Sequence, residues 1–88
     1  MLFVVTITWA VDKAPEMAKR FAEQVGKPPP KGVKTTLYTL LGRCKSVAIV
    51  EAPNEKAILQ EHLPFIDIAE CDWAPAMVAE DALKAFSG

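Results

Sequence analysis

His62 is the only histidine in this 88-residue sequence and the side chain best suited to proton transfer. An imidazole changes its charge near neutral pH, so it can serve as a general base or as a hydrogen-bonding contact for a ligand. On a helical wheel, its direction is shared by Ile58, Leu59, Leu63 and Ile66. We therefore expect His62 to face a sheet, either as a packed core group or as a weak catalytic candidate that lines a pocket.

Four further side chains could form a pocket with His62. Trp9 and Trp73 stand near the ends of two strands that we expect to be neighbours, and Cys71 and Asp67 precede Trp73 closely. The predicted ligand pocket therefore consists of Trp9, His62, Asp67, Cys71 and Trp73. The alternative is that the tryptophans fill the core and that Asp67 is a cap or a surface group. A buried Asp67 would instead have a raised pKa and could exchange protons.

Motifs for metals, cofactors and nucleic acids are absent from the sequence. Cys44 and Cys71 have no second cysteine at metal-binding spacing, and the four glycines are too scattered to form a phosphate-binding loop. The net charge is −1, and residues 44–50 include no aromatic side chain on which a base could stack. We therefore expect no metal, no cofactor and no nucleic-acid partner.

The beginning of the sequence bears on location. Residues 1–9 are mostly apolar, without a basic leader or a small-residue cleavage site. The run is far shorter than the ~20 residues that a membrane span needs. Two cysteines without a disulfide framework fit a reducing compartment. We expect a cytoplasmic protein with no membrane partner.

Charge is distributed unevenly along the chain. Residues 1–45 contain eight basic and three acidic side chains, a net charge of +5. Residues 46–88 contain two basic and eight acidic side chains, a net charge of −6. This polarity fits either a complementary contact between subunits or simply the two ends of one compact domain.

The first half of the chain predicts a strand, a helix and a hairpin. Residues 2–10 are apolar on both faces, as in a central strand. Asp12 fits the N-cap of a helix that has Pro15 in its first turn and stops at Gly26. The inward side of this helix should carry Met17, Ala18, Phe21 and Val25. After a stiff proline spacer at 28–30, residues 33–41 and 44–51 should pair as strands around a turn at 42–43.

The second half predicts a helix, an edge strand and a terminal helix. Asn54 fits an N-cap, and Pro64 should end the helix that begins there. Residues 69–77 form a strand, which Pro75 assigns to a sheet edge because proline cannot donate to a ladder. The terminal helix at 78–86 should turn Val78, Ala82, Leu83 and Phe86 inward.

This order defines a single α+β domain over residues 1–88, with the ferredoxin-like βαββαβ succession. Right-handed crossovers give a four-stranded antiparallel sheet of order 4-1-3-2 with the helices on one face. The other face should be lined by Val4, Thr6, Thr8, Ser46, Ala48 and Val50. No helix remains to cover it, so we expect a homodimer through this open sheet face.

Several short features of the chain occur together in a known group of proteins. They are Met1-Leu2-Phe3, Arg20-Phe21, Pro30-Lys31-Gly32, Phe65 with Asp67, and Pro75. Over about residues 1–80, the sequence resembles small uncharacterised proteins, of the domain-of-unknown-function type, in the dimeric α/β-barrel superfamily. The resemblance implies a ferredoxin-like fold and a dimer whose sheets face each other. It implies no single activity, because the superfamily includes monooxygenases, haem-degrading enzymes, isomerases and amino-acid-sensing domains.

Three functions follow as expectations, and whether the protein is an enzyme stays open. The leading expectation is an uncharacterised dimeric protein that binds a small, largely apolar molecule. The second is a cofactor-independent monooxygenase or isomerase of the same superfamily, using His62 in a pocket shaped by Trp9 and Trp73. Haem degradation fits less well, because it also relies on an asparagine in the first strand, where this sequence has Thr6 and Thr8. The third is a protein–protein interaction module that joins a basic 33–41 edge to an acidic 69–77 edge.

Overall fold

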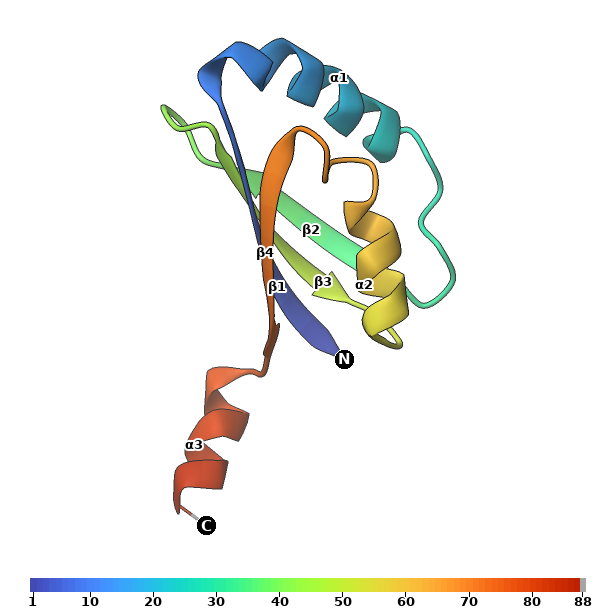
Figure 1. The fold of residues 1–88 in the computed structure, drawn as a ribbon. Coiled ribbons are helices and arrows are strands. Elements are labelled where there is room, and N and C mark those ends of the chain that lie inside the picture. The colour runs from blue at the N-terminus through green and yellow to red at the C-terminus, as the bar shows by residue number, and fades with distance from the viewer. Residues whose placement is uncertain (88) are drawn as a thin grey trace.

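The computed structural model of the chain describes residues 1–87, which form one sheet, two helices packed on it and a third helix beyond it (Figure 1). The elements are β1 (Leu2–Trp9), a 3₁₀ turn (Val11–Lys13), α1 (Ala14–Val25), β2 (Lys34–Thr39), β3 (Lys45–Glu51), α2 (Glu55–His62), β4 (Ala69–Ala76) and α3 (Ala79–Ser87). The predicted ferredoxin-like succession is therefore confirmed.

The sheet has the order β2-β3-β1-β4, and all of its pairs are antiparallel. This is the predicted order read from the opposite edge. β1 lies inside, as its two apolar faces require, and β4 lies at an edge with Pro75 opposite Phe3. Both placements confirm the sequence-based prediction.

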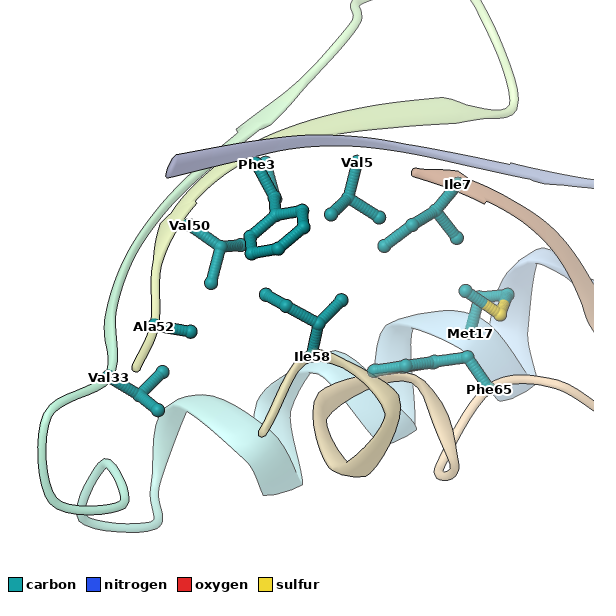
Figure 2. Close-up of a cluster of buried hydrophobic side chains, with 10 residues drawn as sticks. Phe3, Val5, Ile7, Met17, Val33, Val50, Ala52, Ile58 and Phe65 are labelled. Atoms are coloured by element: carbon teal, nitrogen blue, oxygen red, sulfur yellow. The ribbon is translucent and has the colours of Figure 1, made fainter. Parts of the chain in front are cut away.

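The core lies between the sheet and the helices α1 and α2. Phe3, Val5 and Ile7 alternate along β1 and point at the helices, where Ile58 and Met17 face them (Figure 2). Phe3 and Ile58 are completely buried. Each fully buried side chain of this size contributes about 1.5–3 kcal/mol to the free energy of unfolding, so this layer carries most of the stability.

The side of the sheet that β3 presents to solvent differs from the expectation. Ser46, Ala48 and Val50 are buried on the helix side, because the register sets them opposite Ile7, Val5 and Phe3. Residues that face each other across a ladder share a face of the sheet. The open sheet face is therefore the face that carries Leu2, Val4, Thr6, Thr8, Lys34, Thr36, Tyr38, Lys45, Val47, Ile49, Glu51, Glu70, Asp72, Ala74 and Ala76.

The start of α1 also differs from the expectation. Asp12 lies in the 3₁₀ turn, and Lys13 is the N-cap of α1 without a side-chain hydrogen bond. Pro15 does occupy the first turn, and Gly26 does end the helix. Met17 is buried and Phe21 half-buried, as predicted. Two other residues expected to be inward, Ala18 and Val25, are exposed because α1 faces the sheet only along the Met17–Phe21 line.

The helix α2 follows the sequence rules closely. The Asn54 side-chain oxygen accepts a hydrogen bond from the Ala57 N–H at 3.0 Å, which confirms the predicted cap. Ile58 and His62, one turn apart, are its two buried residues. Pro64 follows the helix end, as expected.

The terminal helix α3 is not packed inward, contrary to the prediction. It projects away from the sheet beyond the end of β4 (Figure 1). Leu83 is 65% exposed and Phe86 90% exposed, and Val78 is exposed as well. Its amphipathic pattern is real, but residues 1–76 offer it no surface within the same chain. Across residues 1–87, no helix has the length and apolar character needed to cross a bilayer.

Candidate functional site

A pocket of about 650 Å³ opens between the sheet and the helices on the β2 side. Its floor and walls are apolar, from Val5, Ile7, Ala48 and Val50 on the sheet and Phe21, Ile58 and Phe65 on the helical layer. Its volume lies in the range of small-molecule sites, about 300–1,000 Å³. The geometry therefore allows a small apolar molecule to lie inside the core layer.

The pocket exists because the helices leave β2 uncovered. All six residues of β2 are exposed, and Thr35 and Leu37 contribute to the pocket wall. The segment 26–33 closes one end with its three prolines. Beyond the predicted role as a stiff spacer, these prolines form part of the pocket lining.

Polar side chains lie at the mouth of the pocket and at one position inside it. Lys27 and Lys34 line the mouth together with Gln24, Gln60 and Glu61. Burial raises the pKa of Glu61, so this carboxyl takes up a proton more readily than one in water. Glu61 was not among the predicted site residues. Its position beside His62 was the available signal, but a helical wheel alone gives no pocket.

His62 is the predicted site residue that lines this pocket. It is 4% exposed and faces the sheet from the last turn of α2, as the helical wheel predicted. Among the described residues, its Nε2 atom has no hydrogen-bond partner. Burial lowers the pKa of His62, so the imidazole is neutral at pH 7. A buried polar atom without a partner costs free energy, about 1–3 kcal/mol.

Trp73 lies beside His62 on the β4 side. The two rings are 6.0 Å apart between centroids, and Trp73 also meets Phe3 edge to face at 5.7 Å. The indole is 40% exposed, so it is not a core filler, and it is not among the residues that line the pocket. These two predicted pocket residues are therefore brought together.

Trp9 belongs to the other end of the sheet. It pairs with Ala69, whereas Trp73 pairs with Val5, so the two tryptophans are four residues apart along β1. That separation corresponds to about 13 Å. Trp9 instead meets Phe21 at 5.7 Å and borders a shallow depression that Asp67 also lines. The sequence placed both tryptophans near strand ends without giving the register that separates them.

Asp67 is an ion-pair partner at the surface. Arg20 donates to both of its oxygens, with 3.0 Å from Nη2 to Oδ2, and donates from Nη1 to the Pro64 carbonyl at 2.8 Å. The Asp67 side chain is 61% exposed. The Arg20 hydrogen bond lowers the pKa of Asp67, so the carboxylate stays ionised at neutral pH. This geometry favours the surface role over the acid–base role.

Cys71 lies on β4 between Trp73 and the end of the strand that pairs with Trp9. It is opposite Ile7 and packs against the core. Burial, and secondarily the charge of Asp72, raises the pKa of its thiol. The thiol is therefore protonated at neutral pH and a weak nucleophile. Both cysteines are free. Within residues 1–87, no group of three or more His, Cys, Asp or Glu side chains lies close enough to hold a metal ion.

These observations define the class of protein: an α+β domain of ferredoxin-like topology with an apolar pocket between its two layers. A family model described as "Domain of unknown function (DUF3303)" matches residues 1–88, so the chain belongs to this family. No curated protein matches the chain significantly. The function of the protein must therefore be inferred from the chemistry of the site itself.

Proposed function

We propose that the protein binds a small, largely apolar molecule in the pocket beneath α1 and α2, with His62 hydrogen-bonding a single polar group of that molecule. The observation that carries the proposal is His62, a residue with an unpartnered, buried Nε2 that lines a pocket of about 650 Å³ with apolar floor and walls. Apolar walls supply affinity, and one placed polar group supplies orientation. A neutral imidazole can accept or donate that hydrogen bond.

A matched pair of probes tests this proposal. We expect 1-naphthol to bind more tightly than naphthalene, by about fivefold, because one hydrogen bond contributes roughly 1 kcal/mol. In His62→Leu, the two probes should bind equally. Calorimetric titration gives the four dissociation constants. No binding of either probe to the native protein, or an unchanged preference in His62→Leu, would overturn the proposal.

The proposal includes a homodimer of the dimeric α/β-barrel type, in a cytoplasmic setting. Its support is the open sheet face, which is apolar at its centre, with Val4, Val47 and Ile49. Lysines 34 and 45 lie on the β2–β3 half of this face, and Glu70 and Asp72 lie on β4. A two-fold axis parallel to the strands would set each basic half against the acidic half of a second copy.

A second candidate function is proton transfer, as in an isomerase. It is favoured by the lowered pKa of His62, which leaves the imidazole as a neutral base at pH 7. The probe is 1-tetralone, a bicyclic ketone close to 1-naphthol in shape. We expect the native protein to accelerate deuterium exchange at C2, observed by NMR, and His62→Leu to lose this effect. Exchange at the uncatalysed rate would leave binding as the function.

A further inference from the structure

The apolar stripe of α3 has no partner among residues 1–87. Ala79, Ala82, Leu83 and Phe86 fall on one side of the helix at helical spacing. Phe86 is 90% exposed, and Met77 and Val78 before the helix are exposed too. The radius of gyration, 14.3 Å, exceeds the value of about 12 Å for a compact domain of this length. The helix α3 is therefore an apolar arm that projects from the rest of the chain.

The register places this arm at a defined corner of the sheet. Ala76, at the end of β4, lies in the same row as Leu2, Glu51 and Lys34. Lys34 begins β2, next to the proline segment that closes the pocket. A two-fold axis parallel to the strands keeps each row at its own end of the sheet and exchanges the β4 edge for the β2 edge. In such a dimer, α3 leaves beside the β2 edge of the second copy.

The β2 edge has apolar and basic side chains that could receive the apolar and acidic side chains of α3. The mouth of the pocket there has two exposed apolar side chains, Val25 at 79% and Leu37 at 37%. Lys27 and Lys34 flank them. The first turn of α3 carries Glu80 and Asp81. The two surfaces therefore match in character, since each has apolar side chains and the acidic groups of one are complementary to the basic groups of the other.

We propose that α3 of each copy docks on a second copy of this chain, laying Leu83 and Phe86 over the mouth of its pocket at the β2 edge. Each pocket then gains a wall from the other subunit, and the site is complete only in the dimer. This proposal requires the homodimer that is part of the proposed function, but it does not require that the pocket binds an apolar molecule. An anionic lipid surface is a poorer occupant, because the polar side of α3 is mainly acidic.

Intermolecular disulfide formation tests the docking directly. In a chain carrying Cys44→Ala and Cys71→Ala, one isotope-labelled copy carries Phe86→Cys and one unlabelled copy carries Val25→Cys. After mixing and mild oxidation, we expect a mixed covalent dimer by mass spectrometry. Lys19→Cys, on the exposed side of α1, is the matched control and should give at most a tenth of that yield. An unlabelled copy with Tyr38→Cys in place of Val25→Cys tests whether α3 lies on the open sheet face instead.

The outcomes separate the proposals. A cross-link to Val25→Cys supports docking at the pocket mouth, whether or not 1-naphthol binds. A preferred cross-link to Tyr38→Cys, or none above the control, overturns it even if 1-naphthol binds with the expected preference. The double variant Leu83→Glu with Phe86→Glu supplies a second measurement. We expect its dimer dissociation constant to rise at least tenfold, against less than threefold for Lys84→Glu, and equal constants for the two variants would overturn the docking.

Discussion

Arg20 in α1 holds Asp67 in the α2–β4 connection through a two-pronged ion pair, across 47 positions of sequence. The neighbouring rings Phe21 and Phe65 meet at 5.0 Å between centroids. The short features Arg20-Phe21 and Phe65 with Asp67 therefore contact each other pairwise, one polar pair and one apolar pair. Together they fasten α1 to the segment that follows α2.

Breaking the polar pair should loosen this attachment without unfolding the sheet. In Arg20→Ala we expect faster amide hydrogen exchange in α1 and at residues 65–68, with little change in β1 and β3. Arg20 also holds the Pro64 carbonyl, so Asp67→Asn should have the smaller effect. Uniform acceleration across all elements, measured by mass spectrometry, would show that the pair supports the whole fold and not this attachment.

Stability should fall as the pH drops below about 6.5. Burial lowers the pKa of His62 from its ordinary value of 6.5, so the unfolded chain binds a proton that the folded chain does not. The free energy of unfolding should then decrease by at most about 1.4 kcal/mol per pH unit, and stay level above pH 7. Glu61 acts in the opposite sense, because its pKa is raised and acid favours the folded form.

Denaturant unfolding between pH 5 and 8 measures this dependence. His62→Leu should remove the loss of stability in acid, and Glu61→Gln should steepen it. At pH 7, His62→Leu should be more stable by about 1 kcal/mol, since it removes an unpartnered buried nitrogen. A destabilised His62→Leu protein would mean that the imidazole is satisfied within the core.

The Asn54 cap gives a prediction with a close control. Asn54→Ala removes the acceptor for the Ala57 N–H and should lower the free energy of unfolding by about 1 kcal/mol. Asn54→Asp keeps the acceptor and should cost much less. Thermal unfolding of the three proteins decides the point, and equal losses for both variants would indicate that the cap does not support α2.

The open sheet face should be sensitive to charge at its centre. Val47→Lys places an ammonium group among Thr6, Ile49 and Tyr38, and should convert a dimer into a monomer at micromolar concentration. Ala22→Lys adds the same charge on the exposed side of α1 and should leave the mass unchanged. Native mass spectrometry reads both variants. A native protein that is already monomeric would contradict the dimer.

The place of β1 and β4 in the sheet could be predicted from local composition. The face of the sheet to which each side chain of β3 points could not. β1 reads as central because both its faces are apolar, and Pro75 alone identifies the edge. In β3, however, Val47 and Ile49 alternate with Ala48 and Val50, so all four are apolar. Hydrophobicity cannot decide which pair points at the helices. The pairing of Ala48 with Val5 decides it, and that register is a tertiary fact.

The candidate site was predictable in part for the same reason. His62 was placed inward by helical spacing, whereas its contact with Trp73 of β4 is tertiary and could not be read from spacing. Trp9 was separated by register, and Asp67 was drawn to the surface by Arg20, 47 residues away. The stripe of α3 is the same whether it packs within the chain or on another copy. Periodicity reports that a face is apolar, not what it contacts.

The contact between His62 and Trp73 gives the protein an internal optical signal. The indole of Trp73 stands 6.0 Å from the single imidazole, while Trp9 lies at the far end of the sheet against Phe21. We expect the fluorescence of Trp73 to change when His62 takes up a proton, because the two rings are in contact. With Trp9→Phe as the background, tryptophan emission comes from Trp73 alone and should report the protonation of His62 without an added dye.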